Sequence, residues 1–188
     1  MAERELWCKR IAHVDPRRMM FLDETGAKTN MTRLYGCTRG GARVKDYAPH
    51  GHWNTTTLVA VVGWTGPSAP MVLDGPMDSE AFEAYIAQVL LPVLQPGMIV
   101  VMDNLSPHKR SKIVSLIEEV GAELWYLPPY SPDFNPIELM WSKVKEYLRA
   151  AKARSKEALW EATACALDTV TPQDTAGWFR HCGVCIIT

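Results

Sequence analysis

Three acidic residues stand where this sequence could build a site for divalent cations. Asp23 and Asp103 each follow a short apolar run, 19–22 and 98–102, and Glu138 opens a predicted helix. Three carboxylates that share a pocket cannot all stay ionised without a compensating cation, and hard oxygen ligands favour Mg²⁺ or Mn²⁺. Two such ions about 3.5–4 Å apart clamp the attacking and leaving oxygens of a phosphodiester. The residue types therefore predict metal-dependent chemistry on phosphates, provided that the fold brings the three together.

The same acidic residues also have a purely structural interpretation. Glu138 follows Asn135 by three residues, and a glutamate at that position commonly closes a capping box and complements the helix dipole. An aspartate at a strand end is often a turn residue, which is what we expect of Asp133. The interpretations differ in whether the three carboxylates converge.

A basic stripe is predicted along the helix that contains Glu138. At about 100° per residue, four basic side chains fall within about 40° of Glu138, if the helix extends that far. They are Lys145, Arg149, Lys152 and Lys156. The opposite face, expected to pack on a sheet, contains Met140, Val144, Tyr147 and Ala151. The stripe is either a solvated helix face or a track for phosphates that leads to a metal site.

The order of predicted elements gives the fold class. Apolar or β-branched runs predict strands at 19–22, 55–62, 70–73, 98–102 and 122–127, and a hairpin is expected from 34–37 and 43–47. Helices are expected from Asp78 to about Pro96, from Ser106 to Gly121 and from Asn135, with one or two covering helices after about residue 155. This order indicates an α/β fold with a mixed central sheet flanked by helices, in which Asp23 and Asp103 would converge if their strands are neighbours.

Composition excludes several classes of protein. The 188 residues are 47% hydrophobic and 22% charged, which is typical of a globular chain and excludes intrinsic disorder. Apolar runs stop far short of the roughly 18 residues that span a bilayer, and the first ten residues do not resemble a signal peptide, so we expect a cytoplasmic protein without a membrane anchor. A net charge of −1 does not by itself indicate a nucleic-acid binder.

The cysteines predict neither a disulfide framework nor a strong zinc site. There are five, an odd number, and they are widely scattered, which favours reduced thiols. Cys182 and Cys185 form a Cys-x-x-Cys after His181, but a second ligand pair at suitable spacing is missing.

Three segments in order carry a resemblance to a known family. They are FLDETG at 21–26, VVMDN at 100–104 followed by His108, and LPPYSPDFNPIE at 127–138. They resemble the catalytic domain of DDE transposases and, more narrowly, a bacterial insertion-sequence transposase of the mariner superfamily. Asp103 and Glu138 are separated by 34 residues, which is similar to a spacing known in that superfamily. The likeness extends from about residue 15 to residue 183.

The resemblance implies an RNase H-like fold, two Mg²⁺ or Mn²⁺ ions and double-stranded DNA as substrate. It implies that Asp23, Asp103 and Glu138 are the catalytic metal ligands. Activated water would cut a strand at the element's end, and the freed 3′-hydroxyl would attack target DNA, typically at a TA dinucleotide. Asn104 and His108 match the family pattern and are expected to line the site, with helix capping or packing as the alternative.

Further residues are candidates to contact DNA because they add local positive charge. Lys109 and Arg110 follow His108, and Arg39 lies in the predicted hairpin. The segment 50–53, His-Gly-His-Trp, also matches family usage, although its tryptophan is as well explained by packing.

This sequence departs from the family pattern in one respect. Full-length relatives carry N-terminal helix-turn-helix modules that bind the terminal repeats, and Asp23 comes only about twenty residues after the start of this chain. We therefore expect that module on a separate reading frame or to have been lost, and a nucleoid-associated protein that forms a homodimer on DNA. The expected division is an N-terminal lead-in at 1–17, the catalytic domain at 18–154, and covering helices of the same domain at 155–188.

Two rival functions remain open at this point. The first is an RNase H-like nuclease that hydrolyses nucleic acid without strand transfer. The second is a non-catalytic DNA-binding protein derived from such a domain, in which Asp103→Asn would leave every function intact.

Overall fold

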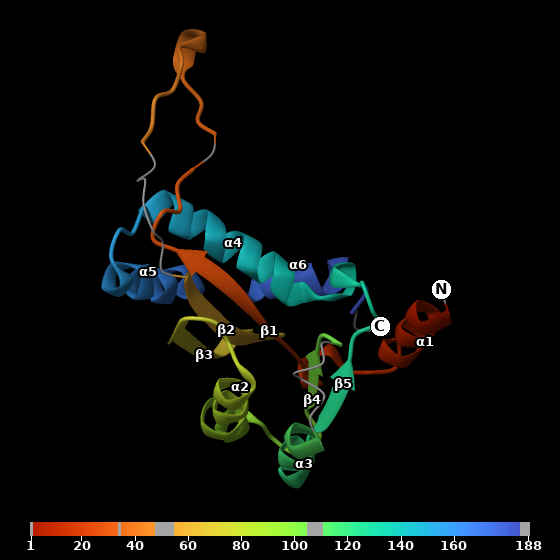
Figure 1. The fold of residues 1–188 in the computed structure, drawn as a ribbon. Coiled ribbons are helices and arrows are strands. Elements are labelled where there is room, and N and C mark those ends of the chain that lie inside the picture. Colours follow the sequence, from red (N-terminus) through yellow and green to blue (C-terminus); the bar gives the residue numbers. More distant parts are fainter. Residues whose placement is uncertain (1, 34, 48–54, 105–110, 185–188) are drawn as a thin grey trace.

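A five-stranded sheet forms the centre of the protein in the computed structural model, which describes residues 2–33, 35–47, 55–104 and 111–184 (Figure 1). The spatial order of the strands is β3-β2-β1-β4-β5. They are β1 (Met19–Lys28), β2 (Thr55–Gly63), β3 (Gly66–Asp74), β4 (Ile99–Met102) and β5 (Glu123–Tyr126). β1 pairs antiparallel with β2, and β2 with β3, whereas β1, β4 and β5 are parallel. The predicted mixed α/β sheet is confirmed.

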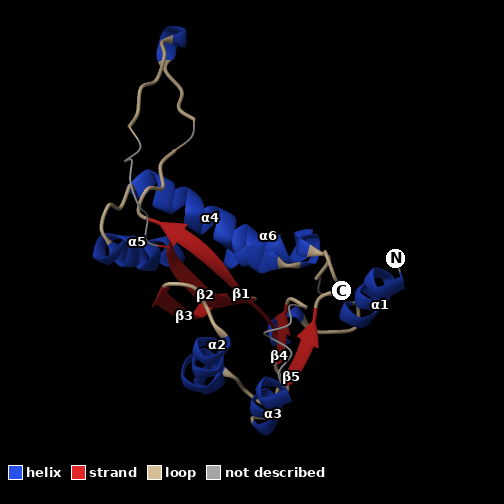
Figure 2. Cartoon of the chain, in the orientation of Figure 1, coloured by secondary structure: helices blue, strands red, loops and turns tan. Residues whose placement is uncertain are grey.

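Helices cover both faces of this sheet (Figure 2). One hydrophobic core joins the sheet to α1 (Ala2–Ile11), α4 (Pro136–Ala151), α5 (Lys156–Asp168) and α6 (Pro172–His181). A second core lies on the other face, under α2 (Ser79–Tyr85) and α3 (Ser111–Glu119). The covering helices expected after residue 155 are therefore α5 and α6.

The alternation of side chains along β1 and β4 determines on which face of the sheet Asp23 and Asp103 lie. Met19 and Phe21 belong to the core under α4, while Met20 and Leu22 belong to the core under α2 and α3. Successive side chains of a strand point to opposite faces of the sheet. Asp23 therefore lies on the same face as Met19 and Phe21, which is the face that α4 covers. The same alternation along β4 directs Asp103 to that face.

The prediction for β1 was too short. Asp23 does not end the strand, which continues to Lys28 because its second half pairs with β2 as far as Thr55. The parallel pairing with β4, however, stops at Phe21 and Val101. Asp23 therefore still lies just beyond the point where the parallel strands separate.

Helix α4 packs on the sheet through a face that differs from the predicted one. Met140 and Val144 are buried as expected, but Tyr147 is 37% exposed and Ala151 is exposed as well. The core face is completed by Ile137, Trp141 and Leu148. The predicted face was wrong by about 45° around the helix axis, because the face opposite Glu138 is not the one that contains the tryptophan and the leucine.

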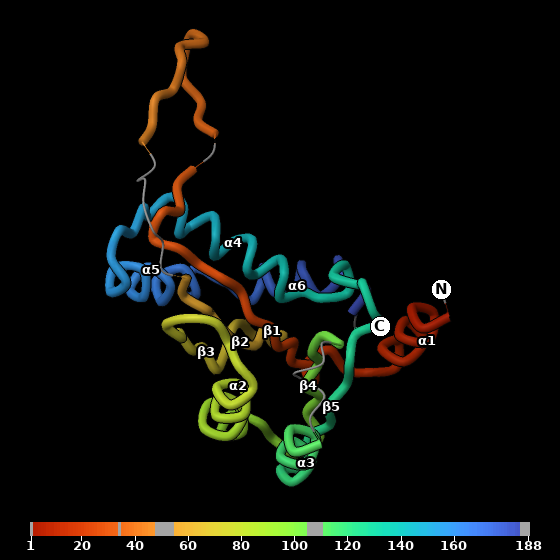
Figure 3. Tube along the Cα trace, viewed as in Figure 1, coloured from red at the N-terminus to blue at the C-terminus, as the bar shows by residue number. Residues whose placement is uncertain are grey.

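The described part of the segment between β1 and β2 projects away from the body of the protein (Figure 3). The predicted hairpin strands are absent from its described residues, 29–33 and 35–47, which contain only a short 3₁₀ turn, η2 (Arg39–Gly41). Tyr35 and Tyr47 are 91% and 85% exposed, so the segment buries no face of its own. A two-stranded ribbon without a buried face has too little to stabilise it.

Two other local predictions need adjustment. The α-helix that begins after the Asp78 cap ends at Tyr85. A π-helical turn and then a 3₁₀ turn follow it as far as Val93, so the helical segment stops short of Pro96. The N-terminal lead-in contains α1, whose Trp7 and Ile11 are buried in the core.

The four cysteines that the structure describes are not joined in disulfides. Cys8, Cys37, Cys165 and Cys182 are free thiols, and burial raises the pKa of Cys182 to about 11. Cys185 lies outside the described residues. Among the helices that the structure describes, none combines the length and apolar character needed to cross a bilayer.

Candidate active site

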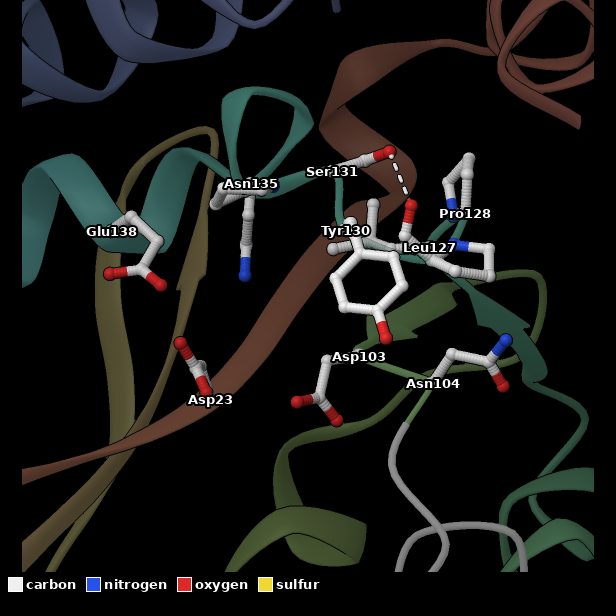
Figure 4. Close-up of a pocket in the computed structure, with 11 residues that line it drawn as sticks. Asp23, Asp103, Asn104, Leu127, Pro128, Tyr130, Ser131, Asn135 and Glu138 are labelled. Carbon is white, nitrogen blue, oxygen red and sulfur yellow. Dashed lines mark hydrogen bonds between the residues drawn. The ribbon is translucent and has the colours of Figure 1, made fainter. Parts of the chain in front are cut away.

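One cavity of about 370 Å³ is lined by all three acidic residues singled out in the sequence. Asp23 comes from β1, Asp103 from the end of β4 and Glu138 from the first turn of α4. Figure 4 shows their carboxylates directed into the same space. Asn104, also predicted for this site, lines the cavity beside Asp103.

The strand register explains why Asp23 and Asp103 are level with each other. Phe21 pairs with Val101 in the parallel β1–β4 ladder, and each aspartate follows two residues later. The strands diverge at this point, which leaves a crevice beyond the carboxyl end of β4. Two carboxylates are thereby held at the edge where the helix carrying Glu138 begins.

Burial and neighbouring carboxylates both favour the protonated form of Asp23. Its Oδ1 accepts a hydrogen bond of 2.8 Å from the backbone N–H of Glu24, which favours the ionised form. Burial nevertheless raises the pKa of Asp23 to about 8, and the negative charges of Glu138, Glu24 and Asp103 act in the same direction. A cation between these carboxylates would remove that repulsion.

The residues present fit a hard divalent cation. The cavity offers three carboxylates, and carboxylate oxygens are the ligands that Mg²⁺ and Mn²⁺ prefer. In the described part of the chain, no three His, Cys, Asp or Glu side chains are close enough to enclose one ion. The carboxylates therefore share a cavity without being gathered at a single point.

The start of α4 excludes one structural interpretation of Glu138, the capping box with Asn135. Asn135 precedes the helix, but its side chain makes no capping hydrogen bond, so the predicted alternative of a capping box is not formed. The side chain of Glu138 instead extends into the cavity (Figure 4). The capping box of this protein is found elsewhere, between Thr171 and Asp174 at the start of α6.

The loop between β5 and α4 forms a wall of the cavity that the sequence interpretation did not assign to the site. Tyr130 and Ser131 line the cavity, and Tyr130 is fully exposed at φ 54°. A left-handed conformation is unusual for an aromatic residue and costs backbone energy. The hydroxyl of Ser131 donates a 3.2 Å hydrogen bond to the carbonyl of Pro129 across this turn. The signal available in the sequence was the dense group of prolines at 128, 129 and 132.

Arg4 on α1 binds the loop between β5 and α4 through its side chain. Its guanidinium donates to Ser131 Oγ at 2.8 Å and to both carboxylate oxygens of Asp133 at 2.9 and 2.5 Å. It also lies 4.3 Å from the ring centre of Phe134. These contacts hold the pKa of Asp133 below its usual range. One side chain of the N-terminal helix thus contacts three residues of the segment that leads to Glu138.

Removal of Arg4 is expected to loosen this loop more than it destabilises the protein. Arg4 and Asp133 are both partly exposed, and such pairs contribute about 1 kcal/mol or less to stability. Arg4→Ala should therefore shift the melting temperature by only a few degrees. Amide hydrogen exchange should accelerate selectively at residues 130–135.

Lys9→Ala, at an exposed position of the same helix, is the matched control and should leave this exchange unchanged. Equal exchange in Arg4→Ala and the wild type would show that the loop is held by its prolines alone.

The basic stripe is shorter than predicted. Lys145 and Arg149 lie on α4 as expected, but α4 ends at Ala151 and Lys152 takes a left-handed conformation. Lys152 Nζ binds Asp46 at 2.5 Å, and Lys156, which belongs to α5, binds Asp74 at 2.6 Å. The prediction that Lys152 and Lys156 continue the stripe is therefore wrong.

Of the remaining residues predicted to contact DNA, one lies far from the cavity and the others lie outside the described part of the chain. Arg39 is in η2, which lies at the end of the projecting segment, remote from the cavity (Figure 1). The other candidates lie outside the described residues. They are His108, Lys109, Arg110 and the segment 50–53.

Comparisons with known proteins place the chain in a family. The family model of the DDE superfamily endonucleases matches residues 18–160. Among curated proteins, none matches the sequence.

Solved structures share the fold at low sequence identity. A pre-cleavage Mos1 transpososome matches with a TM-score of 0.74 and 14% identity over 96% of this chain and 56% of the other. A Mos1 strand transfer complex has a TM-score of 0.74 and 15% identity, and covers 96% and 55% of the two chains. The catalytic domain of Mos1 mariner transposase has a TM-score of 0.63 and 12% identity, and covers 96% and 83%. The chain thus spans a little over half the length of the Mos1 chains in the two complexes.

The family model covers most of the chain, and its region contains Asp23, Asp103 and Glu138. The mixed sheet with helices on both faces is the RNase H-like arrangement of the Mos1 catalytic domain. The chain therefore belongs to the DDE superfamily endonucleases and has their RNase H-like fold.

Proposed function

We propose that this chain is the catalytic domain of a transposase, which cleaves DNA strands at transposon ends and joins the freed 3′-hydroxyl to target DNA. The observation that carries the proposal is the convergence of Asp23, Asp103 and Glu138 on one cavity. Solved relatives support it, since they include a Mos1 strand transfer complex and Mos1 paired-end complexes with Mn and with Mg.

In this proposal the three carboxylates hold two Mg²⁺ or Mn²⁺ ions. When bound, such ions lower the pKa of a nucleophilic water and stabilise the oxygen that leaves phosphorus. Asp23 supplies a ligand from within β1 and Asp103 from the position directly after β4, while Glu138 supplies one from a helix that is buried against the sheet. Two of the three ligands therefore lie on regular elements, and the third directly follows one.

The proposed partner is double-stranded DNA, comprising transposon ends and a target that contains TA. We propose that the chain acts as a homodimer on DNA, because two ends require two active sites. Recognition of the terminal repeats is assigned to a helix-turn-helix module outside these residues. Within the chain, 18–154 would form the catalytic domain, with 1–17 leading into it and 155–188 covering it.

The decisive experiment separates strand transfer from simple hydrolysis. A short duplex with a recessed, labelled 3′-hydroxyl end is incubated with supercoiled plasmid, the protein and Mn²⁺. Covalent transfer of the label to the plasmid is the expected result. Nicked plasmid without label would identify an RNase H-like nuclease, and an intact plasmid would favour a DNA-binding protein without catalysis.

Lys145 and Arg149 are expected to bind phosphates of the DNA backbone. Each contact releases about 0.9 counterion, so replacing either by Ala should make the slope of log K against log salt about one unit less steep. Lys156→Ala is the control, because Lys156 is already paired with Asp74 and should change the slope less. Fluorescence anisotropy of a labelled duplex at several salt concentrations measures all three. An equal change of slope in all three variants would contradict a specific role for the two α4 residues.

A further inference from the structure

Asn135 is a buried amide whose hydrogen-bonding capacity is not used within the protein. It is 4% exposed, and its Oδ1 has no hydrogen-bond partner among the residues that the structure describes. Asn is a preferred N-cap residue because its side chain can accept from the N2 or N3 backbone N–H, yet the Asn135 side chain makes no such bond. The side chain therefore does not cap α4, and its amide nitrogen is the group that remains free to act in the cavity.

The amide is directed into the cavity of the three carboxylates. Asn135 lines this cavity, and Figure 4 shows its side-chain nitrogen pointing into the space between Glu138 and Tyr130. An asparagine N–H is a neutral donor, which can contact an anion without competing for a cation. Three prolines in the adjoining wall offer no backbone N–H, so side-chain donors are needed there.

We propose that Asn135 is a substrate-contacting catalytic residue that donates a hydrogen bond to a non-bridging oxygen of the scissile phosphodiester. This inference rests on the proposed function of the site. A donor fixed in position before the reaction stabilises the charge on the phosphoryl oxygens without having to reorganise. The short path from Asn135 to Glu138 within one helical turn places this donor beside a metal ligand.

Asp and Ser substitutions separate this role from helix capping. Both are as good as Asn at an N-cap, so they preserve or improve any structural contribution. Neither presents an amide N–H, and Asp adds a negative charge beside the phosphate. Ser155→Ala is the control, since Ser155 caps α5 through a 3.1 Å hydrogen bond from Ala158 N–H and does not line the cavity.

Three properties are measured on the full chain and each variant. They are the melting temperature, the affinity for Mn²⁺ by electron paramagnetic resonance, and Mn²⁺-dependent nicking of supercoiled plasmid. A fourth measurement follows binding of the dinucleotide TpT through broadening of its ³¹P resonance by protein-bound Mn²⁺. Asn135→Ser should keep the wild-type melting temperature and Mn²⁺ affinity, while nicking falls about 100-fold and TpT binding about tenfold. Ser155→Ala should lower only the melting temperature.

The other outcomes each decide the question. If Asn135→Ser keeps nicking and TpT binding, or if the Ser and Asp variants both lose stability, Asn135 is structural and the proposal is wrong. If the wild type does not bind TpT with Mn²⁺, the proposal is also wrong. If the wild type binds TpT through Asn135 but neither nicks nor joins strands, the inference stands and the proposed function fails.

Discussion

Replacing Asp103 by Asn is expected to reduce Mn²⁺-dependent nicking and strand joining by at least about 1000-fold. The substitution preserves the volume of the side chain but removes the charge that a divalent cation needs. Because Asp23 and Glu138 line the same cavity, Asp23→Asn and Glu138→Gln should cause losses of the same size. Residues that act as one unit are not additive, so the triple variant should be no worse than a single one.

The control for this series is Glu146→Gln. Glu146 is an exposed carboxylate on the same helix as Glu138, two turns further on, and its loss should leave nicking unchanged. Isothermal titration with Mn²⁺ should show weakened binding in the three cavity variants and wild-type binding in the control. Wild-type nicking by Asp103→Asn would contradict the proposed metal site and favour the non-catalytic rival.

The second large effect is a loss of stability of the metal-free protein as pH rises. Asp23 has a pKa of about 8 in the folded protein, raised first by burial and then by Glu138, compared with 3.8 for the ordinary side chain. Between these values the folded state retains a proton that the unfolded state releases. The free energy of unfolding therefore falls as pH rises, by up to about 1.4 kcal/mol per pH unit from this group.

Asp23→Asn isolates this contribution. Urea unfolding in the presence of EDTA at pH 5, 6, 7 and 8 should show a stability that declines in the wild type and stays flatter in the variant, so that the variant is the more stable protein at pH 8 by a few kcal/mol. Carboxylates with lowered pKa values, such as Asp174, act below this window and cancel in the comparison. Saturating Mg²⁺ should restore the wild type at pH 8, because a bound cation favours the ionised carboxylate. Parallel pH profiles for the two proteins would show that Asp23 ionises normally.

Much of the site could be predicted because its determinants are local in the sequence. Asp23 and Asp103 each follow a short apolar run, and such a run, buried in a parallel sheet, ends at the edge where ligands bind. The Asn135-Pro136 pair marks the start of a helix, which places Glu138 in its first turn. These patterns were sufficient to predict the mixed sheet and the element that carries each carboxylate, whereas the expectation that the three converge came from the resemblance to DDE transposases.

Errors arose where the outcome depends on distant parts of the chain. The basic stripe was extended through Lys152 and Lys156, but α4 ends where Lys152 pairs with Asp46 of the projecting segment. The hairpin failed because its strands have nothing to pack against, and no local pattern reports that absence. The face of α4 was misplaced because the contacts of Trp141 are decided by the sheet and by α5.

The sequence by itself determined the family, the three acidic residues and the elements that carry them, because these follow from short motifs and from periodicity. Only the tertiary structure decided that Asn135 leaves its cap unused and faces the carboxylates, and that Arg4 fastens the loop before Glu138. Arg4 and Asp133 are 129 residues apart, so their pairing depends on how α1 packs on the completed core. A hydrogen-bond partner at that separation is fixed by packing, and local sequence preferences carry no information about it.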